Sequence, residues 1–116
     1  ILDDVKGRML EDIVLLEVRK TAPSTMEAFK FKFDAGGEFD MVIYDKAGQN
    51  CRIYEIKHST EVNEKQTLHL RDAEKCQIVE KRFGPISGKF VLYRGKDTFA
   101  EGVQYLNVEN FLYGLK

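Results

Sequence analysis

The stretch FDMVIYDKAGQNCRIYEIK, residues 39–57, decides the fold that we predict for this chain. It contains two runs rich in β-branched and aromatic residues, 39–44 and 51–57, separated by the turn-forming segment 46–50. This pattern predicts two strands joined by a tight turn. Apolar side chains occupy both faces of each run, so we expect other elements to cover both faces of the hairpin.

Three ionisable residues interrupt this apolar hairpin: Asp40, Glu55 and Lys57. Glu55 and Lys57 are two positions apart on one strand, so their side chains leave the same face. A hairpin register centred on Gly48 brings Asp40 within reach of Glu55. Buried charges need partners, and two carboxylates beside an amine suit a hard cation such as Mg²⁺. Lys57 would then orient or deprotonate a water, or offset charge growing on a phosphate oxygen.

Length and composition predict a single domain, 1–116, of an ordinary globular type. The chain has 43% hydrophobic and 32% charged residues. No apolar run approaches the roughly 20 residues of a membrane-spanning helix, and no signal-peptide pattern opens the sequence. The two cysteines, Cys51 and Cys76, are expected to be reduced core residues. These features favour a cytoplasmic protein with no membrane partner.

The charges are unevenly distributed, although the net charge is only −1. Residues 1–56 carry 8 basic and 11 acidic groups (−3), and residues 97–116 carry 1 and 3 (−2). Residues 57–96 carry 9 and 5 (+4), so the basic excess directly follows the second strand of the hairpin. Two interpretations stay open: a solvated helix face of mixed charge, or a surface that follows a phosphate backbone.

The rest of the chain predicts further elements around the hairpin. These are a helix over 3–20, a strand over 27–33, a helix from about 63 to 82, strands over 88–93 and 103–108, and a short terminal helix through 113. The order α-β-β-β-α-β, with a small tail, predicts an α/β fold with a mixed central sheet flanked by helices.

The first predicted helix carries an apolar stripe with an acidic residue beside it. The stripe runs through Val5, Met9, Ile13 and Leu16, and is widened by Leu10 and Val14. Glu11 lies near the border of this stripe. By itself, that position favours an exposed glutamate without a functional role.

An acidic residue in the first helix, an Asp in a strand and Glu-x-Lys in the next strand resemble the PD-(D/E)XK nuclease superfamily. This superfamily includes restriction endonucleases and Holliday-junction resolvases. The segments GRMLE at 7–11, EFDMV at 38–42 and YEIK at 54–57 carry the resemblance, which covers nearly the whole chain. They look most like the nuclease-like domain at the C-terminal end of many prokaryotic AAA-type ATPases. The chain begins at Ile1 without an initiator Met, so we expect it to be part of a longer ATPase.

The resemblance implies a restriction-endonuclease-like core and a role for five residues. Asp40 and Glu55 would be the metal-binding carboxylates, and the backbone carbonyl of Ile56 would complete the site. Lys57 would be the catalytic lysine, and Glu11 would be an outer ligand or a water-positioning group. The implied cofactor is Mg²⁺ or Mn²⁺.

Several other polar residues are weaker candidates. Gln66 occupies the position of a glutamine that some relatives carry on the second helix, but Leu70 stands where those relatives have an aromatic residue. His58 and His69 are interpreted as surface or boundary residues, because neither has a partner at metal-ligand spacing. Arg94 is likewise interpreted as a surface residue.

The leading functional hypothesis is metal-dependent hydrolysis of DNA phosphodiester bonds by a Mg²⁺-dependent endonuclease. Its expected partners are DNA and an ATPase domain attached in the parent chain. The alternative is a catalytically silent C-terminal module that binds DNA or protein for that ATPase. A structural dimerisation domain is a third hypothesis, and a homodimer stays open. No GxxxxGK[ST] phosphate loop occurs, so ATP hydrolysis would belong to another part of the parent.

Overall fold

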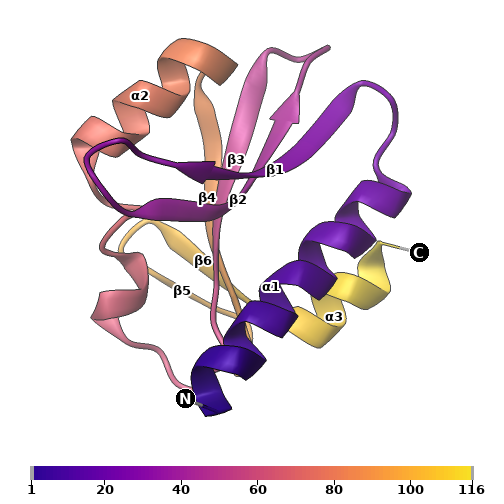
Figure 1. The fold of residues 1–116 in the computed structure, drawn as a ribbon, viewed down its shortest axis with the longest axis vertical. Helices are drawn as coiled ribbons and strands as arrows, with labels where there is room; N and C mark the ends of the chain where they lie inside the picture. Colours follow the sequence, from indigo (N-terminus) through magenta and orange to yellow (C-terminus); the bar gives the residue numbers. More distant parts are fainter. Residues whose placement is uncertain (1, 116) are drawn as a thin grey trace.

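The computed structural model describes residues 2–115, with side chains from residue 6 onward, and shows a six-stranded mixed sheet with helices on both faces (Figure 1). In chain order the elements are α1 (Leu2–Thr21), β1 (Met26–Lys32), β2 (Glu38–Asp45), β3 (Asn50–Ile56), the 3₁₀ helix η1 (Glu64–Thr67), α2 (Ala73–Phe83), β4 (Ile86–Tyr93), β5 (Thr98–Ala100), β6 (Val103–Asn107) and α3 (Val108–Gly114). The predicted α/β class and mixed sheet are confirmed.

The sheet has the strand order β1-β2-β3-β4-β6-β5. Strands β1, β2 and β3 form an antiparallel meander, whereas β4 is parallel to β3 and β6 is parallel to β4. The short strand β5 pairs antiparallel with β6 at one edge of the sheet. Because β3, β4 and β6 run in the same direction, their carboxyl ends meet at one edge.

The central hairpin forms as the sequence predicts. Its register runs from Asp45 opposite Asn50 to Met41 opposite Tyr54. Beyond these pairs the side chain of Asp40 accepts a hydrogen bond from the backbone N–H of Ile56, and its charge acts on Glu55, so Asp40 lies within reach of Glu55 as expected. The hairpin therefore supplies the two carboxylates from adjacent strands.

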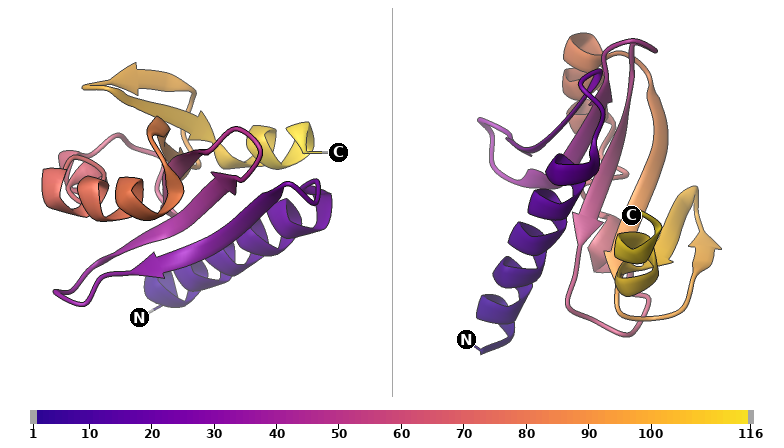
Figure 2. Two further views of the ribbon diagram at one scale, coloured as in Figure 1. Left: turned by 90° about the horizontal axis from the view of Figure 1, so that it is seen from above. Right: turned by 90° about the vertical axis from the view of Figure 1, so that its right-hand side faces the viewer.

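Helix α2 lies on one face of the sheet and α1 and α3 lie on the other (Figure 2). A hydrophobic core fills the space on each face. Val42 of β2 and Val79 of α2 are fully buried in the first core. The second core joins Val14 of α1, Met41 of β2 and Val108 of α3, so α1 and α3 share the opposite face. No helix within residues 2–115 combines the length and the apolar character needed to cross a membrane.

The predicted buried stripe of the first helix was wrong. Met9, Ile13 and Leu16 are exposed, and the side chain of Val5 lies outside the described residues. The two residues predicted to widen the stripe are confirmed, since Val14 is fully buried and Leu10 packs against the same core. Val18, which was not predicted, completes the buried face. The reason is that apolar residues surround much of this helix, so spacing alone does not select the face that meets the sheet. The buried face of α1 matters for the candidate site, because Glu11 lies on the partly buried side of this helix.

The predicted helix over 63–82 was also wrong at its start. Its first part is the short 3₁₀ helix η1, capped by Asn63, and α2 begins only after Asp72. The Asp72 side chain accepts hydrogen bonds from the backbone N–H groups of Glu74 and Lys75. Short polar side chains that bond nearby backbone groups favour caps over helix interiors, which explains the break. Strand β5 was not predicted.

Candidate metal centre

A β-bulge positions the first candidate ligand. The register between β1 and β2 shifts between Phe29 and Phe31, so two residues of β2, Asp40 and Met41, lie opposite Lys30. A bulge bends its strand and re-aims a side chain, and such bulges are frequent beside active sites. Here the bulge occurs at the residue that the sequence predicted as a metal ligand.

Asp40 is fixed between β2 and β3. It is buried, and its Oδ2 accepts a hydrogen bond of 2.8 Å from the backbone N–H of Ile56. The N–H and the C=O of one strand residue point toward the same neighbour, so the Ile56 carbonyl faces the side on which Asp40 lies. Its predicted role as a metal ligand stays a prediction.

Glu55 is the most deeply buried of the candidate carboxylates, with 2% of its surface exposed. Its Oε2 lies 3.8 Å from the Nζ of Lys57, whereas its Oε1 is buried without a hydrogen-bond partner among the described residues. Burial, and then the negative charge of Asp40, raise the pKa of Glu55 well above its usual range. Buried polar atoms are normally paired, so this oxygen needs either a proton shared with Asp40 or a bound cation.

Asp40 also belongs to a group of three carboxylates with Glu11 of α1 and Glu38 at the start of β2, and Glu55 is not a member of this group. One carboxylate oxygen each from Glu11, Glu38 and Asp40 lie within 4.8 Å of one another. The Nζ of Lys30 is 3.4 Å from Glu11 Oε1 and 3.9 Å from Glu38 Oε1. Glu11 and Asp40 were predicted, whereas Glu38 and Lys30 were not.

The electrostatics show that this cluster has excess negative charge. Burial, and then the charge of Asp40, raise the pKa of Glu11 to about 7, although Lys30 acts in the opposite direction. Burial lowers the pKa of Lys30, but the neighbouring charges of Glu11 and Glu38 outweigh burial and raise it overall. The lysine ammonium therefore supplies only part of the positive charge that these carboxylates could accept.

The cluster borders an open pocket of about 560 Å³. Its lining residues are Gly7, Arg8, Glu11, Ile56, Lys57, His58, Ser59, Asn63 and Gln66. Residues from the N-terminal half of α1 form one wall, and the segment after β3 forms the other. The side chain of Lys57 is 42% exposed, so its amine meets both the buried Glu55 and the open pocket.

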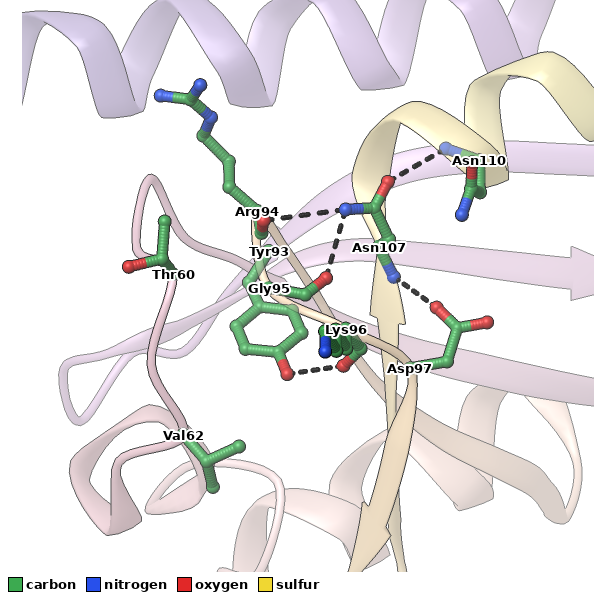
Figure 3. Close-up of a pocket in the computed structure, with 9 residues that line it drawn as sticks. All are labelled: Thr60, Val62, Tyr93, Arg94, Gly95, Lys96, Asp97, Asn107 and Asn110. Carbon is green, nitrogen blue, oxygen red and sulfur yellow. Dashed lines mark hydrogen bonds between the residues drawn. The ribbon is translucent and has the colours of Figure 1, made fainter.

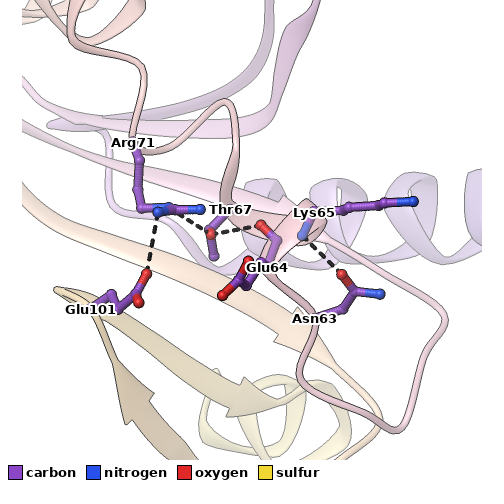
Figure 4. A network of polar contacts seen from close by, with 6 residues as sticks. All are labelled: Asn63, Glu64, Lys65, Thr67, Arg71 and Glu101. Atoms are coloured by element: carbon purple, nitrogen blue, oxygen red, sulfur yellow. Dashed lines mark hydrogen bonds and ion pairs between the residues drawn. The ribbon is translucent and has the colours of Figure 1, made fainter.

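Gln66 lines the pocket but has a structural role. Its Oε1 accepts a hydrogen bond from the backbone N–H of Asn63, and its Nε2 donates one to the backbone oxygen of Glu61. The same segment is tied to the β5–β6 turn by the ion pair between Arg71 and Glu101 (Figure 4). These contacts hold the wall of the pocket in place.

The donor set fits a hard divalent cation. Every side-chain donor is a carboxylate, and Mg²⁺ and Mn²⁺ prefer oxygen ligands. Such an ion would also provide a partner for the Oε1 of Glu55, which has no hydrogen-bond partner among the described residues. Of the two histidines, His58 lines the pocket, whereas His69 packs against Gly37 instead.

The two missed residues differ in the signal that they left. Glu38 precedes Asp40 by two positions on one strand, a spacing that places acidic side chains near each other and could have identified it. Lys30 left no such signal, because its place beside Glu11 depends on how α1 packs on β1.

Comparison with known proteins gives one match. A family model described as a domain of unknown function (DUF4143) matches residues 6–111. This domain is found in proteins associated with AAA-type ATPases. Neither the curated proteins nor the solved structures contain a significant match to the chain.

Proposed function

This chain belongs to the DUF4143 family, and we propose that it is a metal-dependent nuclease domain that hydrolyses phosphodiester bonds in DNA. One observation carries the proposal: the buried carboxylates of Asp40 and Glu55 meet beside an open pocket, with an orphaned oxygen on Glu55 and the amine of Lys57 at the pocket wall. Mg²⁺ or Mn²⁺ is the cofactor that this oxygen donor set suits best.

The element order supports a restriction-endonuclease-like core. Helix α1 precedes the antiparallel strands β1, β2 and β3, and α2 then crosses over to β4, which is parallel to β3. The acidic residues of the PD-(D/E)XK pattern occupy α1, β2 and β3 in that order. This agreement between position and chemistry is what favours a nuclease over other roles of a mixed sheet.

Within the proposed site each residue has a distinct task. Asp40, Glu55 and Glu11 would hold the ion together with the Ile56 carbonyl. A bound ion would polarise a phosphate oxygen and lower the pKa of a coordinated water. The hydrogen bond from the N–H of Ile56 orients Asp40 before any ion arrives. Lys57 would orient the attacking water or offset the charge that grows on a phosphate oxygen.

The experiment compares wild-type protein with Lys57→Ala on supercoiled, linear and branched DNA in Mg²⁺ or Mn²⁺. We expect wild-type cleavage and a loss of about 100-fold or more in Lys57→Ala. Lys46→Ala, at an exposed lysine in the hairpin turn, is the matched control and should cleave like wild type. Cleavage that survives Lys57→Ala would come from a contaminant and would remove the assignment.

One observation favours a catalytically silent module instead. Lys30 lies within ion-pair distance of Glu11 and Glu38, so part of the negative charge of the cluster is neutralised internally. Such a domain would bind DNA or a protein for an attached ATPase without cleaving it. It predicts no cleavage with any divalent metal and no heat of Mn²⁺ binding by calorimetry.

A further inference from the structure

Three parallel strands end at the same edge of the sheet, and basic residues follow two of them. Lys57 and His58 come directly after β3, and Arg94 comes directly after β4. In open α/β sheets, ligands bind in the crevice outside the carboxyl ends of the strands. The residues at this edge therefore lie where such folds commonly bind a ligand.

The backbone that carries Arg94 is held tightly (Figure 3). The N–H of Arg94 donates a hydrogen bond of 2.7 Å to the backbone oxygen of Ser59. The side-chain amide of Asn107 donates to the backbone oxygen of Gly95 at 2.9 Å. A Cβ on Gly95 would lie 2.5 Å from the backbone oxygen of Thr60, so only glycine allows this close approach. These contacts fix the backbone from which the side chain of Arg94 extends.

The guanidinium of Arg94 is free to bind an anion. Its side chain extends away from Tyr93 and Asp97 (Figure 3). Its Nη1 lies 3.3 Å from the Nε2 of His58, and no described carboxylate forms an ion pair with it. The carboxylate of Asp97 accepts a hydrogen bond from the backbone N–H of Asn107 instead. A guanidinium binds a phosphate through two parallel hydrogen bonds, and no described carboxylate competes for this one.

Other basic residues of the stretch 57–96 are occupied within the fold. Arg71 pairs with Glu101, Lys75 pairs with Asp72, and Arg82 lies over the rings of Phe31 and Phe83. Among the remaining basic residues of this stretch, Lys57 and Arg94 are the two that directly follow strands at the strand-end edge.

Two pockets meet at this edge. His58 and Ser59 line the pocket beside Lys57, and Thr60 and Arg94 line a second pocket of about 630 Å³. His58 of the first pocket is in contact with Arg94 of the second, so the two pockets lie next to each other. A ligand that fills both would carry negative charge at more than one point, as a nucleic acid backbone does.

We propose that Arg94, supported by His58, binds a backbone phosphate of a polynucleotide next to the phosphate presented to Lys57. Arg94 is thus a positioning residue that fixes the strand without reading its sequence. The inference rests on the proposed function only in that the bound polymer is a nucleic acid, because binding needs neither metal nor cleavage.

The test measures binding of fluorescein-labelled single-stranded and duplex DNA by anisotropy, in EDTA, over a range of salt concentrations. Arg94→Gln should weaken binding about threefold to tenfold, irrespective of sequence, and should reduce the slope of log affinity against log salt by about 0.7 to 0.9. Arg94→Lys should keep the slope because it keeps the charge. Arg52→Gln, on the amino-terminal half of β3, is the matched control and should bind like wild type.

The outcomes separate this inference from the proposed hydrolysis. DNA binding that depends on Arg94 in a protein that never cleaves would support the inference and remove the nuclease. Cleavage by wild type together with unchanged binding by Arg94→Gln, at an unchanged melting temperature, would overturn the inference alone. Wild-type protein that binds neither form of DNA would overturn the inference as well.

Discussion

Glu55 is the residue whose surroundings are hardest to explain without a ligand. It is 2% exposed, one of its oxygens has no partner, and its closest cation is the exposed amine of Lys57 at 3.8 Å. A carboxylate in such a place destabilises the fold whenever it is ionised. In the proposed site, a bound cation would offset this cost.

The substitution Glu55→Gln should separate the cost of burying this carboxylic acid from its proposed ability to bind a cation. At pH 8 the buried Glu55 must stay protonated, whereas the unfolded chain releases that proton. The amide keeps the shape of the side chain and is neutral without a proton, so the free energy of unfolding of the metal-free protein should rise by about 1 kcal/mol at pH 8. The same change should abolish the stabilisation that Mn²⁺ gives to wild type. Urea unfolding in EDTA and in Mn²⁺ measures both.

The matched control for this change is Glu27→Gln on β1. Glu27 is exposed and pairs only with Lys46, so its loss should leave the response to Mn²⁺ intact. A Glu55→Gln protein that is stabilised by Mn²⁺ as much as wild type would show that Glu55 is not a ligand.

The raised pKa values of Glu11 and Glu55 also predict how stability depends on pH. Glu11 titrates at about 7 in the folded protein, against 4.5 ordinarily, and the pKa of Glu55 is raised further. Above about pH 4.5 the folded protein thus holds protons that the unfolded chain has released. The stabilising contribution of Glu11 is complete below that pH and is lost as the pH rises through 7. The contribution of Glu55 is lost at higher pH, because its pKa is raised further.

Metal-free protein should therefore lose stability between about pH 5 and pH 8, because the folded state binds more protons than the unfolded state. The fall between pH 5 and 7 should be smaller in Glu11→Gln. Stabilisation by Mn²⁺ should grow over the same range, since a metal ligand must be deprotonated. Urea midpoints in EDTA and in Mn²⁺ test this, and a metal-free stability that rises over that range would contradict it.

At the scale of elements, the bulge in the β1–β2 pair creates the site and also supplies its internal cation. Lys30 on β1 lies opposite Asp40 and Met41, and its Nζ is near Glu11 and Glu38. A divalent ion that binds these carboxylates has to compete with that ammonium. The bulge therefore places Lys30 beside the carboxylates, and in the proposed site this lysine would lower the affinity for metal.

Lys30→Gln should bind Mn²⁺ about threefold to fivefold more tightly than wild type, because a partly exposed ion pair contributes up to about 1 kcal/mol. The metal-free variant should be less stable, since the remaining carboxylates repel one another. Isothermal titration calorimetry with Mn²⁺ gives the affinity. Lys32→Gln, at an exposed lysine two positions along the same strand, should match wild type, and a weaker Lys30→Gln would mean that Lys30 helps to hold the ion.

Some elements and site residues were predictable from the local sequence pattern, and others depend on how distant parts of the chain pack. Asp40, Glu55 and Lys57 were predictable because they interrupt two runs that are apolar on both faces and are joined by a clear turn. Lys30 was not, because its partners are chosen by a bulge and by helix packing, neither of which is written in local spacing. The face of α1 failed for the same reason, since several faces of that helix are apolar enough to be buried.

At the scale of the whole molecule, the candidate site joins parts of the chain that are distant in sequence. Glu11 comes from α1, Glu38 and Asp40 from β2, and Glu55 from β3. Helix α1 packs on β1 and β3, and α3 packs beside it on the same face of the sheet (Figure 1). A ligand held by all three elements would tie the N-terminal half of α1 to the sheet, whereas α2 on the other face contributes no carboxylate to the cluster.

Mn²⁺ should therefore slow amide hydrogen exchange unevenly across the molecule. Exchange should slow by about tenfold or more in α1 around Glu11, in residues 38–41 and in residues 55–57, and should change least in α2, because local opening of the liganded elements requires release of the ion. In Glu11→Gln the protection of α1 should disappear while that of β2 and β3 remains. Hydrogen exchange read by mass spectrometry resolves these segments. Protection of the two strands without protection of α1 in wild type would mean that Glu11 only borders the site, and that the ion is held by the hairpin alone.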